Sequence, residues 1–157
     1  MVTTLRADGS PPSTPVYYLN EGGKLYISVT KSRKKTLNVA RDARVTAVVL
    51  AEAHPFKHVQ VQGMAVISDD DLVETSRRIW STFRDELPED FAQVMQDQGR
   101  TLMIVTPTKM TSNLAAGRYP PCSASGLVDF ALESRKVRRK RIKVSRHLFL
   151  FHHSASR

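Results

Sequence analysis

The basic turn Lys31–Lys35 (KSRKK) is the densest group of residues in the sequence that could bind an anion. It supplies four cations, and Thr30 and Ser32 add two hydroxyl groups. A strand-like run, Leu25–Val29, leads into the turn, and a short helix-like segment, Thr36–Arg41, follows it. Free backbone N–H groups and the positive end of that helix would add to the attraction for a phosphate, which guanidinium and ammonium groups bind by geometry and charge. The turn alone is equally consistent with a phosphate site and with a solvated charge cluster.

Other residue types that carry chemistry are poorly placed. His54 and His58 are separated by a proline, with no carboxylate or thiolate at a metal-ligand spacing. The acids Asp69–Asp71 and Glu89–Asp90 stand where helices are expected to begin, so capping explains them. No nucleophile-elbow sequence and no glycine-rich phosphate loop is present. The sequence therefore predicts neither a catalytic residue nor a metal site.

The elements that would position the basic turn are mostly short strands. Five strands are expected before residue 70, at Val2–Arg6, Ser13–Asn20, Leu25–Val29, Val45–Ala51 and His58–Ser68. Their hairpin-like spacing predicts a mainly β protein, an antiparallel barrel. A closing strand, Thr101–Thr106, and a final extended segment, 107–113, come after two helices, so the helical pair is expected as an insertion packed outside the barrel.

Several local features refine this prediction. Pro15 should make the second strand an edge strand or bulge it, because proline donates no ladder hydrogen bond. The run Val45–Ala51 is β-branched and almost wholly apolar, as for a strand covered on both faces. In the following strand, Val59 and Val61 alternate with glutamines, and Met64 and Val66 are expected on the valine side. Gly63 interrupts that period, which predicts a bulge or a close backbone approach.

Two helices are expected between residues 68 and 99. Ser68 before three aspartates is typical of a capped helix start. One face of this first helix would carry Leu72, Val73, Ile79, Trp80 and Phe83. The second helix would open at Pro88, present Phe91, Val94 and Met95 inward, and stop at Gly99.

The charge of the chain is concentrated at its C-terminal end. The net charge is +9, but residues 119–157 hold nine Lys or Arg against two acids, which leaves fifteen bases and thirteen acids in residues 1–118. We expect a barrel domain over 1–118 and a basic, mobile tail over 119–157. No aromatic residue interrupts Arg135–Lys143, so any contact of the tail with nucleic acid would be unspecific. A basic nucleic-acid-binding module stays open as an alternative.

The compartment is predicted from what the sequence lacks. A single cysteine, Cys122, excludes an internal disulfide and fits a reducing environment. No apolar run approaches the roughly 18 residues of a membrane span, and no signal peptide opens the chain. We therefore expect a cytoplasmic protein without membrane partners.

Three stretches together resemble a known family. SPPSTPVYYL, LYISVTKSRKKTLNVARDARV and HVQVQGMAVI are similar to the pyridoxamine-5′-phosphate-oxidase-like (PPOX class) split β-barrels. The likeness is strongest to the actinobacterial branch that binds the deazaflavin coenzyme F420 rather than FMN. It extends from Val2 to about Arg118. The turn Ser32-Arg33-Lys34 with Thr36 and Asn38 behind it, and Arg41-Asp42-x-Arg44 leading into a strand, form a moderately specific part of it.

The resemblance assigns four groups of residues to the cofactor. The phosphate would be held by Arg33, Lys34 and Lys35, with hydroxyl donors from Ser32 and Thr36. Backbone groups beside the ring system would come from Ser28, Val29 and Thr30. The ring pocket would be lined by Thr14, Pro15, Val16 and Tyr18. Polar contacts, reaching the cofactor of a partner subunit, would come from Gln60 and Gln62.

The resemblance implies a homodimeric oxidoreductase with two cofactor sites along the subunit interface. Reduced coenzyme F420 would supply a hydride to a conjugated, electron-poor small molecule, so the protein itself needs no acid–base pair. The acceptor would stack near Tyr17 or Tyr18 and the 51–57 loop. Two alternatives remain: an FMN-binding pyridoxamine-phosphate-oxidase-like protein, and a non-catalytic barrel that binds a flavin or a tetrapyrrole.

Overall fold

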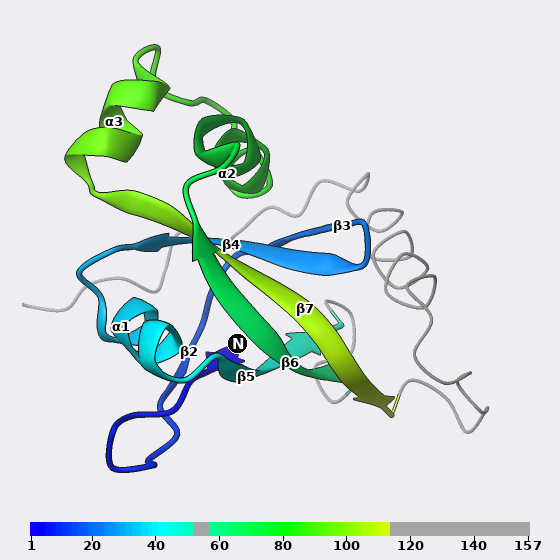
Figure 1. Cartoon of the computed structure of the whole chain (residues 1–157). Helices are drawn as coiled ribbons and strands as arrows, with labels where there is room; N and C mark the ends of the chain where they lie inside the picture. The colour runs from blue at the N-terminus through cyan, green and yellow to red at the C-terminus, as the bar shows by residue number, and fades with distance from the viewer. Residues whose placement is uncertain (52–56, 114–157) are drawn as a thin grey trace, which may run out of the picture.

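A computed structural model describes residues 1–51 and 57–113 of the chain (Figure 1). The elements in chain order are β1 (Val2–Thr3), β2 (Ser13–Thr14), β3 (Leu19–Glu21), β4 (Lys24–Thr30), α1 (Lys34–Arg41), β5 (Arg44–Leu50), β6 (His58–Ser68), α2 (Leu72–Trp80), α3 (Phe91–Asp97) and β7 (Arg100–Ser112). The sequence positions expected for the 119–157 tail, and most of the 51–57 loop, lie outside the described residues.

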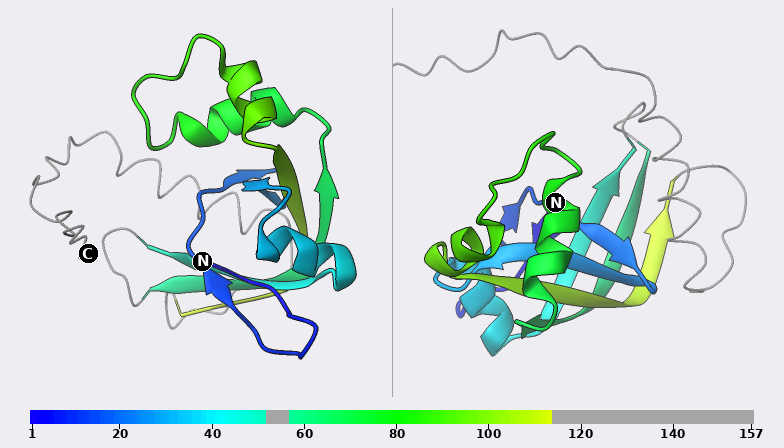
Figure 2. Two further views of the ribbon diagram at one scale, coloured as in Figure 1. Left: turned by 90° about the vertical axis from the view of Figure 1, so that its left-hand side faces the viewer. Right: turned by 90° about the horizontal axis from the view of Figure 1, so that it is seen from above.

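The strands form one antiparallel seven-stranded sheet in the order β2-β1-β5-β6-β7-β4-β3. The two edge strands, β2 and β3, follow one another in the chain, and only residues 15–18 join them. From Thr14 to Leu19 the chain makes five Cα-to-Cα steps, which span at most about 18 Å when extended, so the sheet has to curl until its edges are that close. The result is a half-barrel (Figure 2), which confirms the predicted antiparallel split β-barrel with a helical pair inserted before the last strand.

Alternating side chains on the inner face of the sheet form the main core. Its buried members on the central strands are Leu25, Ile27, Val29, Val45, Ala47, Val49, Val59, Val61, Ala65, Met103 and Val105. Val39 of α1 packs into the same cluster. On the outer face, α2 and α3 cover β3, β4 and the first half of β7, with a second buried cluster of Leu19, Ile79, Trp80, Phe91 and Met95 between them.

The outer face of β5 and β6 differs from its prediction. Strand β5 is not covered on both sides: its burial alternates, and Leu50 is exposed. In β6 the alternation continues through Gly63, so Met64 and Val66 lie with the glutamines on the outer face and are exposed. Burial here follows the alternation of side chains along each strand rather than their apolar content, because no described helix covers this part of the outer face.

The prediction for Gly63 itself is confirmed. The pairing of β6 with β7 shifts register between Gln62 and Gly63, because Gln62 pairs with Lys109 and Gly63 with Pro107. A Cβ added to Gly63 would lie 2.4 Å from the carbonyl oxygen of Thr106. The residue is therefore both beside a bulge and in close backbone contact with the neighbouring strand.

Several predicted element boundaries move. The expected strand Ser13–Asn20 is broken into β2 and β3, as Pro15 at an edge suggested. The first strand ends at Thr3, α1 begins two residues earlier than expected, and α3 begins at Phe91 rather than at Pro88. Gly99 follows α3 with φ 56°, which confirms the predicted helix stop.

The predicted start of α2 is wrong in detail. Ser68 ends β6, and its hydroxyl donates to Asp70 rather than capping the helix. Asp71 occupies the N-cap position with a left-handed backbone, φ 50°, and makes no side-chain cap hydrogen bond. Phe83 follows the helix instead of lying on its face. Within the described residues, no helix is both long and apolar enough to cross a bilayer.

Candidate anion-binding site

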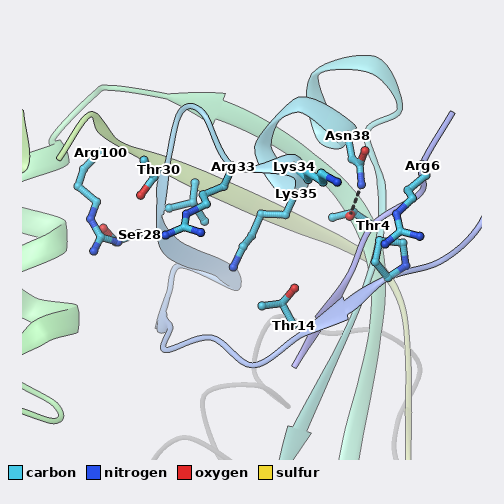
Figure 3. Close-up of a pocket in the computed structure, with 12 residues that line it drawn as sticks. Thr4, Arg6, Thr14, Ser28, Thr30, Arg33, Lys34, Lys35, Asn38 and Arg100 are labelled. Carbon is cyan, nitrogen blue, oxygen red and sulfur yellow. Dashed lines mark hydrogen bonds between the residues drawn. The ribbon is translucent and has the colours of Figure 1, made fainter. Parts of the chain in front are cut away.

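A cavity of about 630 Å³ lies beside α1, where β4 ends and β7 begins (Figure 3). The turn after β1 and strand β2 complete its walls. The residues that line it are Thr4, Arg6, Pro12, Thr14, Ser28, Val29, Thr30, Arg33, Lys34, Lys35, Asn38 and Arg100. Half of the predicted cofactor-binding set is thus brought to one cavity: Thr14, Ser28, Val29, Thr30, Arg33, Lys34 and Lys35.

The basic turn is held in place by hydrogen bonds to its own backbone and to the end of α3. The amide of Lys31 donates to the carbonyl of Gly99 at 2.8 Å, and the amide of Arg33 donates to the carbonyl of Thr30 at 3.1 Å. The hydroxyl of Thr36, buried on α1, donates to that same Thr30 carbonyl at 2.8 Å. These contacts fix the orientation of α1 relative to the turn, and with it the positions of the side chains of the turn that line the cavity.

The four cations of the turn divide between two surroundings. Lys31 pairs with Asp69 at 2.7 Å, and Asp69 also accepts a hydrogen bond from Thr101 at 2.6 Å. The hydrogen bond from Lys31, followed by the one from Thr101, lowers the pKa of Asp69. Arg33, Lys34 and Lys35 instead line the cavity. One cation of the turn therefore anchors it to the start of the helical insertion, and three are directed to the cavity.

Positive charge in the cavity is not balanced by the described residues around it. Five cations line the cavity, Arg6 and Arg100 in addition to the three of the turn, and no carboxylate lines it. The ion pairs within residues 1–51 and 57–113 are Lys31–Asp69, Arg44–Asp42 and Arg78–Glu21, so none involves a lining cation.

The pKa values show the same imbalance. Burial first, then repulsion from Arg33 and Arg100, lowers the pKa of Lys35. Burial, then repulsion from Arg33 and Arg84, lowers the pKa of Arg100. A bound anion would offset both the repulsion and the cost of desolvation, because a nearby negative charge favours the charged forms. Such clusters are typical of functional sites.

Five lining residues were not predicted from the sequence: Thr4, Arg6, Pro12, Asn38 and Arg100. Asn38 lies one turn after Lys34 and Lys35 on α1, a spacing that could have indicated it. Its side chain is buried and donates to the hydroxyl of Thr4 at 3.0 Å. Arg100 is brought to the cavity by its pairing with Thr30 across β4 and β7, a contact that sequence spacing alone does not reveal.

The remaining predicted residues lie outside this cavity. Ser32 is exposed in the turn, and Thr36 is buried behind it. In the crossover 15–18, Pro15 is exposed, while Val16 and Tyr18 pack against the inner core. Gln60 and Gln62 belong to the outer face.

A second, smaller hollow of about 410 Å³ lies on the outer face and includes Gln62 among its lining residues. The contact proposed for Gln60 and Gln62 therefore requires a second subunit and stays a prediction. Within the described residues, no three His, Cys, Asp or Glu side chains are grouped to hold a metal ion. Four of the five histidines lie outside those residues.

Comparisons with known proteins agree with this architecture. The chain is similar in fold to an F420 reductase, with a TM-score of 0.58 and 23% identity over 70% of this chain and 86% of that protein. A conserved hypothetical protein from Mycobacterium tuberculosis has a TM-score of 0.61 and 18% identity, over 80% of this chain and 84% of that protein. A heme binding protein from Mycobacterium smegmatis has a TM-score of 0.55 and 18% identity, over 82% of this chain and 53% of that protein. No curated protein matches the sequence.

The sequence of residues 1–113 matches the profile of one protein family, and that stretch contains every strand and helix described above. The match therefore covers the sheet, the helical insertion and the cation-lined cavity together. The chain belongs to the pyridoxamine 5′-phosphate oxidase family.

Proposed function

We propose that this chain is an oxidoreductase that uses reduced coenzyme F420, held in the cation-lined cavity, to reduce a conjugated small molecule. The observation that carries the proposal is the group of lining cations without a described carboxylate partner. Two of these cations, Lys35 and Arg100, are half-buried, and half-buried charges are normally paired, so their lack of a described acidic partner favours an anionic ligand. The family contains flavin-type oxidoreductases, and the similarity in fold to an F420 reductase is in keeping with the choice of cofactor.

The cavity fits a cofactor of this kind in both size and chemistry. Its volume of about 630 Å³ lies within the range of small-molecule sites. Its cations suit a phosphate, and the end of β4 offers backbone groups along one wall. In this proposal Arg33, Lys34 and Lys35 hold the phosphate while Ser28, Val29 and Thr30 flank the ring system. The bound deazaflavin supplies the hydride; the chain binds it, orients it and excludes water.

The acceptor would stack near the crossover between β2 and β3. Tyr17 of this crossover is 58% exposed, and its ring stacks on that of Phe83 with centroids 3.9 Å apart. An exposed aromatic surface is suited to planar, electron-poor molecules. Tyr18, in contrast, packs against the core, which favours a structural role for that side chain.

We further propose a homodimer formed through the outer face of β5 and β6. Leu50, Met64 and Val66 are exposed there, which is unusual for three large apolar residues on neighbouring strands. Gln60 and Gln62 lie on the same face. A second subunit against this face would remove the apolar side chains from water and bring both glutamines to the interface. Sedimentation of the protein and of Met64→Lys/Val66→Lys tests this, since the double variant should be monomeric.

The cofactor proposal is tested by separate fluorescence titrations with coenzyme F420 and with FMN. Arg33→Ala/Lys35→Ala should weaken binding by about a hundredfold or more, because charge-assisted hydrogen bonds are worth about 1.5–3 kcal/mol each. Lys24→Ala/Arg84→Ala removes the same charge from exposed positions that do not line the cavity and should change little.

The outcomes of these titrations separate the alternatives. Preference for FMN would support the cavity as the cofactor site but replace coenzyme F420 by FMN as the cofactor. Binding of F420 without turnover of any added acceptor would favour a non-catalytic carrier. Binding of neither cofactor by the folded protein would refute the oxidoreductase proposal. Salt-sensitive binding of nucleic acid that disappears on deletion of residues 119–157 would favour the nucleic-acid alternative for that segment.

A further inference from the structure

Arg100 is the lining cation that lies farthest from the basic turn in sequence. It begins β7 and pairs with Thr30, the last residue of β4, so the sheet itself carries it to the cavity. Its Nε donates to the side-chain oxygen of Gln98 at 2.9 Å. None of the ion pairs in the described part of the chain involves it. In Figure 3 the side chain ends beside Ser28, on the side of the cavity opposite Arg6.

The guanidinium of Arg100 has an aromatic partner instead of an acidic one. Its central carbon lies 5.4 Å from the centroid of the Trp80 ring. Trp80, at the end of α2, is 6% exposed, and Phe91 of α3 packs against it edge to face at 5.3 Å. The second core cluster therefore fixes the position of the indole. An indole attracts a guanidinium through its ring face and does not occupy the N–H groups at the guanidinium edge.

We propose that Arg100 is a further anion-binding residue of the cavity and that Trp80 is the positioning residue that holds its guanidinium there. An acidic partner would also fix the arginine, but it would neutralise the charge and compete with the ligand. A cation–π contact fixes it and leaves the positive charge and the N–H donors for a phosphate. The identity of the ligand rests on the proposed function, whereas the anion contact itself does not.

This arrangement gives the helical insertion a part in binding. Neither α2 nor α3 contributes a residue to the lining of the cavity. Through Trp80 they nonetheless determine where one of its cations lies. The affinity of the cavity for an anion should therefore depend on the electronic character of a ring that the anion does not touch.

The single tryptophan of the chain makes this dependence measurable. Biosynthetic replacement of tryptophan by its 5-fluoro and by more highly fluorinated forms weakens cation–π attraction with little change in volume. Each form is titrated with coenzyme F420 and, separately, with inorganic phosphate at constant ionic strength. We expect affinity to fall stepwise with fluorination, by about two- to fivefold in all. The fluorine NMR signal of the single site should shift when phosphate binds.

Substitutions provide the matched controls. Arg100→Ala should weaken both titrations by about tenfold or more, and Arg100→Lys should restore part of the loss. Arg84 also stacks on Trp80, at 4.7 Å, but does not line the cavity, so Arg84→Ala should leave affinity within about twofold. Circular dichroism and thermal unfolding of every variant establish that it is folded.

Each result bears on the proposal separately from the choice of cofactor. Unchanged titrations with Arg100→Ala, or an equal loss with Arg84→Ala, would refute the role of Arg100. A loss with Arg100→Ala but none with fluorination would refute the role of Trp80. Phosphate binding that depends on Arg100, in a protein that binds no F420, would support this inference and refute the cofactor proposal.

Discussion

Replacing Gly63 by alanine should destabilise the fold through a backbone clash. The added Cβ would lie 2.4 Å from the carbonyl oxygen of Thr106 and 3.1 Å from its carbonyl carbon. A carbon and a carbonyl oxygen in close contact are about 3.3 Å apart, so β6 and β7 must separate locally by about 0.9 Å. The obstacle is main chain in the middle of a ladder, so a rotamer change cannot relieve it.

The expected size of the effect follows from that separation. Ladder hydrogen bonds of about 2.9 Å would stretch beyond about 3.5 Å, and losing two of them costs about 2 kcal/mol. Alanine also lowers the conformational entropy of the unfolded chain, which offsets about 0.5–1 kcal/mol of this loss in the free energy of unfolding. The net loss in the free energy of unfolding is about 1–1.5 kcal/mol. For a domain of this size the melting temperature should fall by about 4–12 °C.

Urea denaturation followed by circular dichroism measures this loss directly. Thr106→Ala in the Gly63→Ala background should not restore stability, because the clashing oxygen belongs to the backbone. Gly63→Ser should be at least as unstable as Gly63→Ala. A Gly63→Ala protein with the midpoint of the parent, or a higher one, would show that the strands accommodate the methyl group and would refute the reasoning.

Three further predictions follow from the site and its supports. Hydrogen bonds from Arg44 lower the pKa of Asp42 to about 2. The pKa of Asp42 is lower in the folded than in the unfolded protein, so this stabilisation is complete above about pH 4 and is lost as the pH falls toward 2. The urea midpoints of the parent and of Asp42→Asn should therefore converge over that pH range. Thr36→Val should lower the free energy of unfolding by about 1 kcal/mol through loss of the bond to the Thr30 carbonyl, whereas Thr36→Ser should keep most of it. Inorganic phosphate at ten times its dissociation constant should stabilise the protein by about 1.4 kcal/mol relative to chloride at equal ionic strength, and Arg33→Ala/Lys35→Ala should not respond.

Local patterns in the sequence were sufficient for most of the sheet. Hairpin spacing, the bulge beside Gly63 and the stop at Gly99 each have a cause within a few residues, and each is present in the structure. The basic turn was likewise found from composition alone, since one strand and one helix deliver its side chains. Such features are local, and a single sequence contains them.

Features that depend on distant pairing were missed. Arg100 reaches the cavity only because β4 and β7 pair, and no pattern near residue 100 indicates this. The outer face of β5 and β6 was misjudged for a related reason: apolar content predicts burial only if something covers the strand, and the described helices lie elsewhere. The left-handed Asp71 was missed because a serine followed by three aspartates offers several competing cap positions.

The crossover 15–18 has a consequence for aggregation. Unpaired strand edges are templates on which other chains add, and natural sheets limit them with short strands and prolines. Here both edges come from one stretch of chain, as strands of two and three residues flanked by Pro11, Pro12 and Pro15. One segment thus caps the sheet at both ends. A single proteolytic cut within it would leave both edge strands held only by their own short pairings, β2 on β1 and β3 on β4. Loss of these pairings would expose β1 and β4 and give a sheet that can grow in two directions.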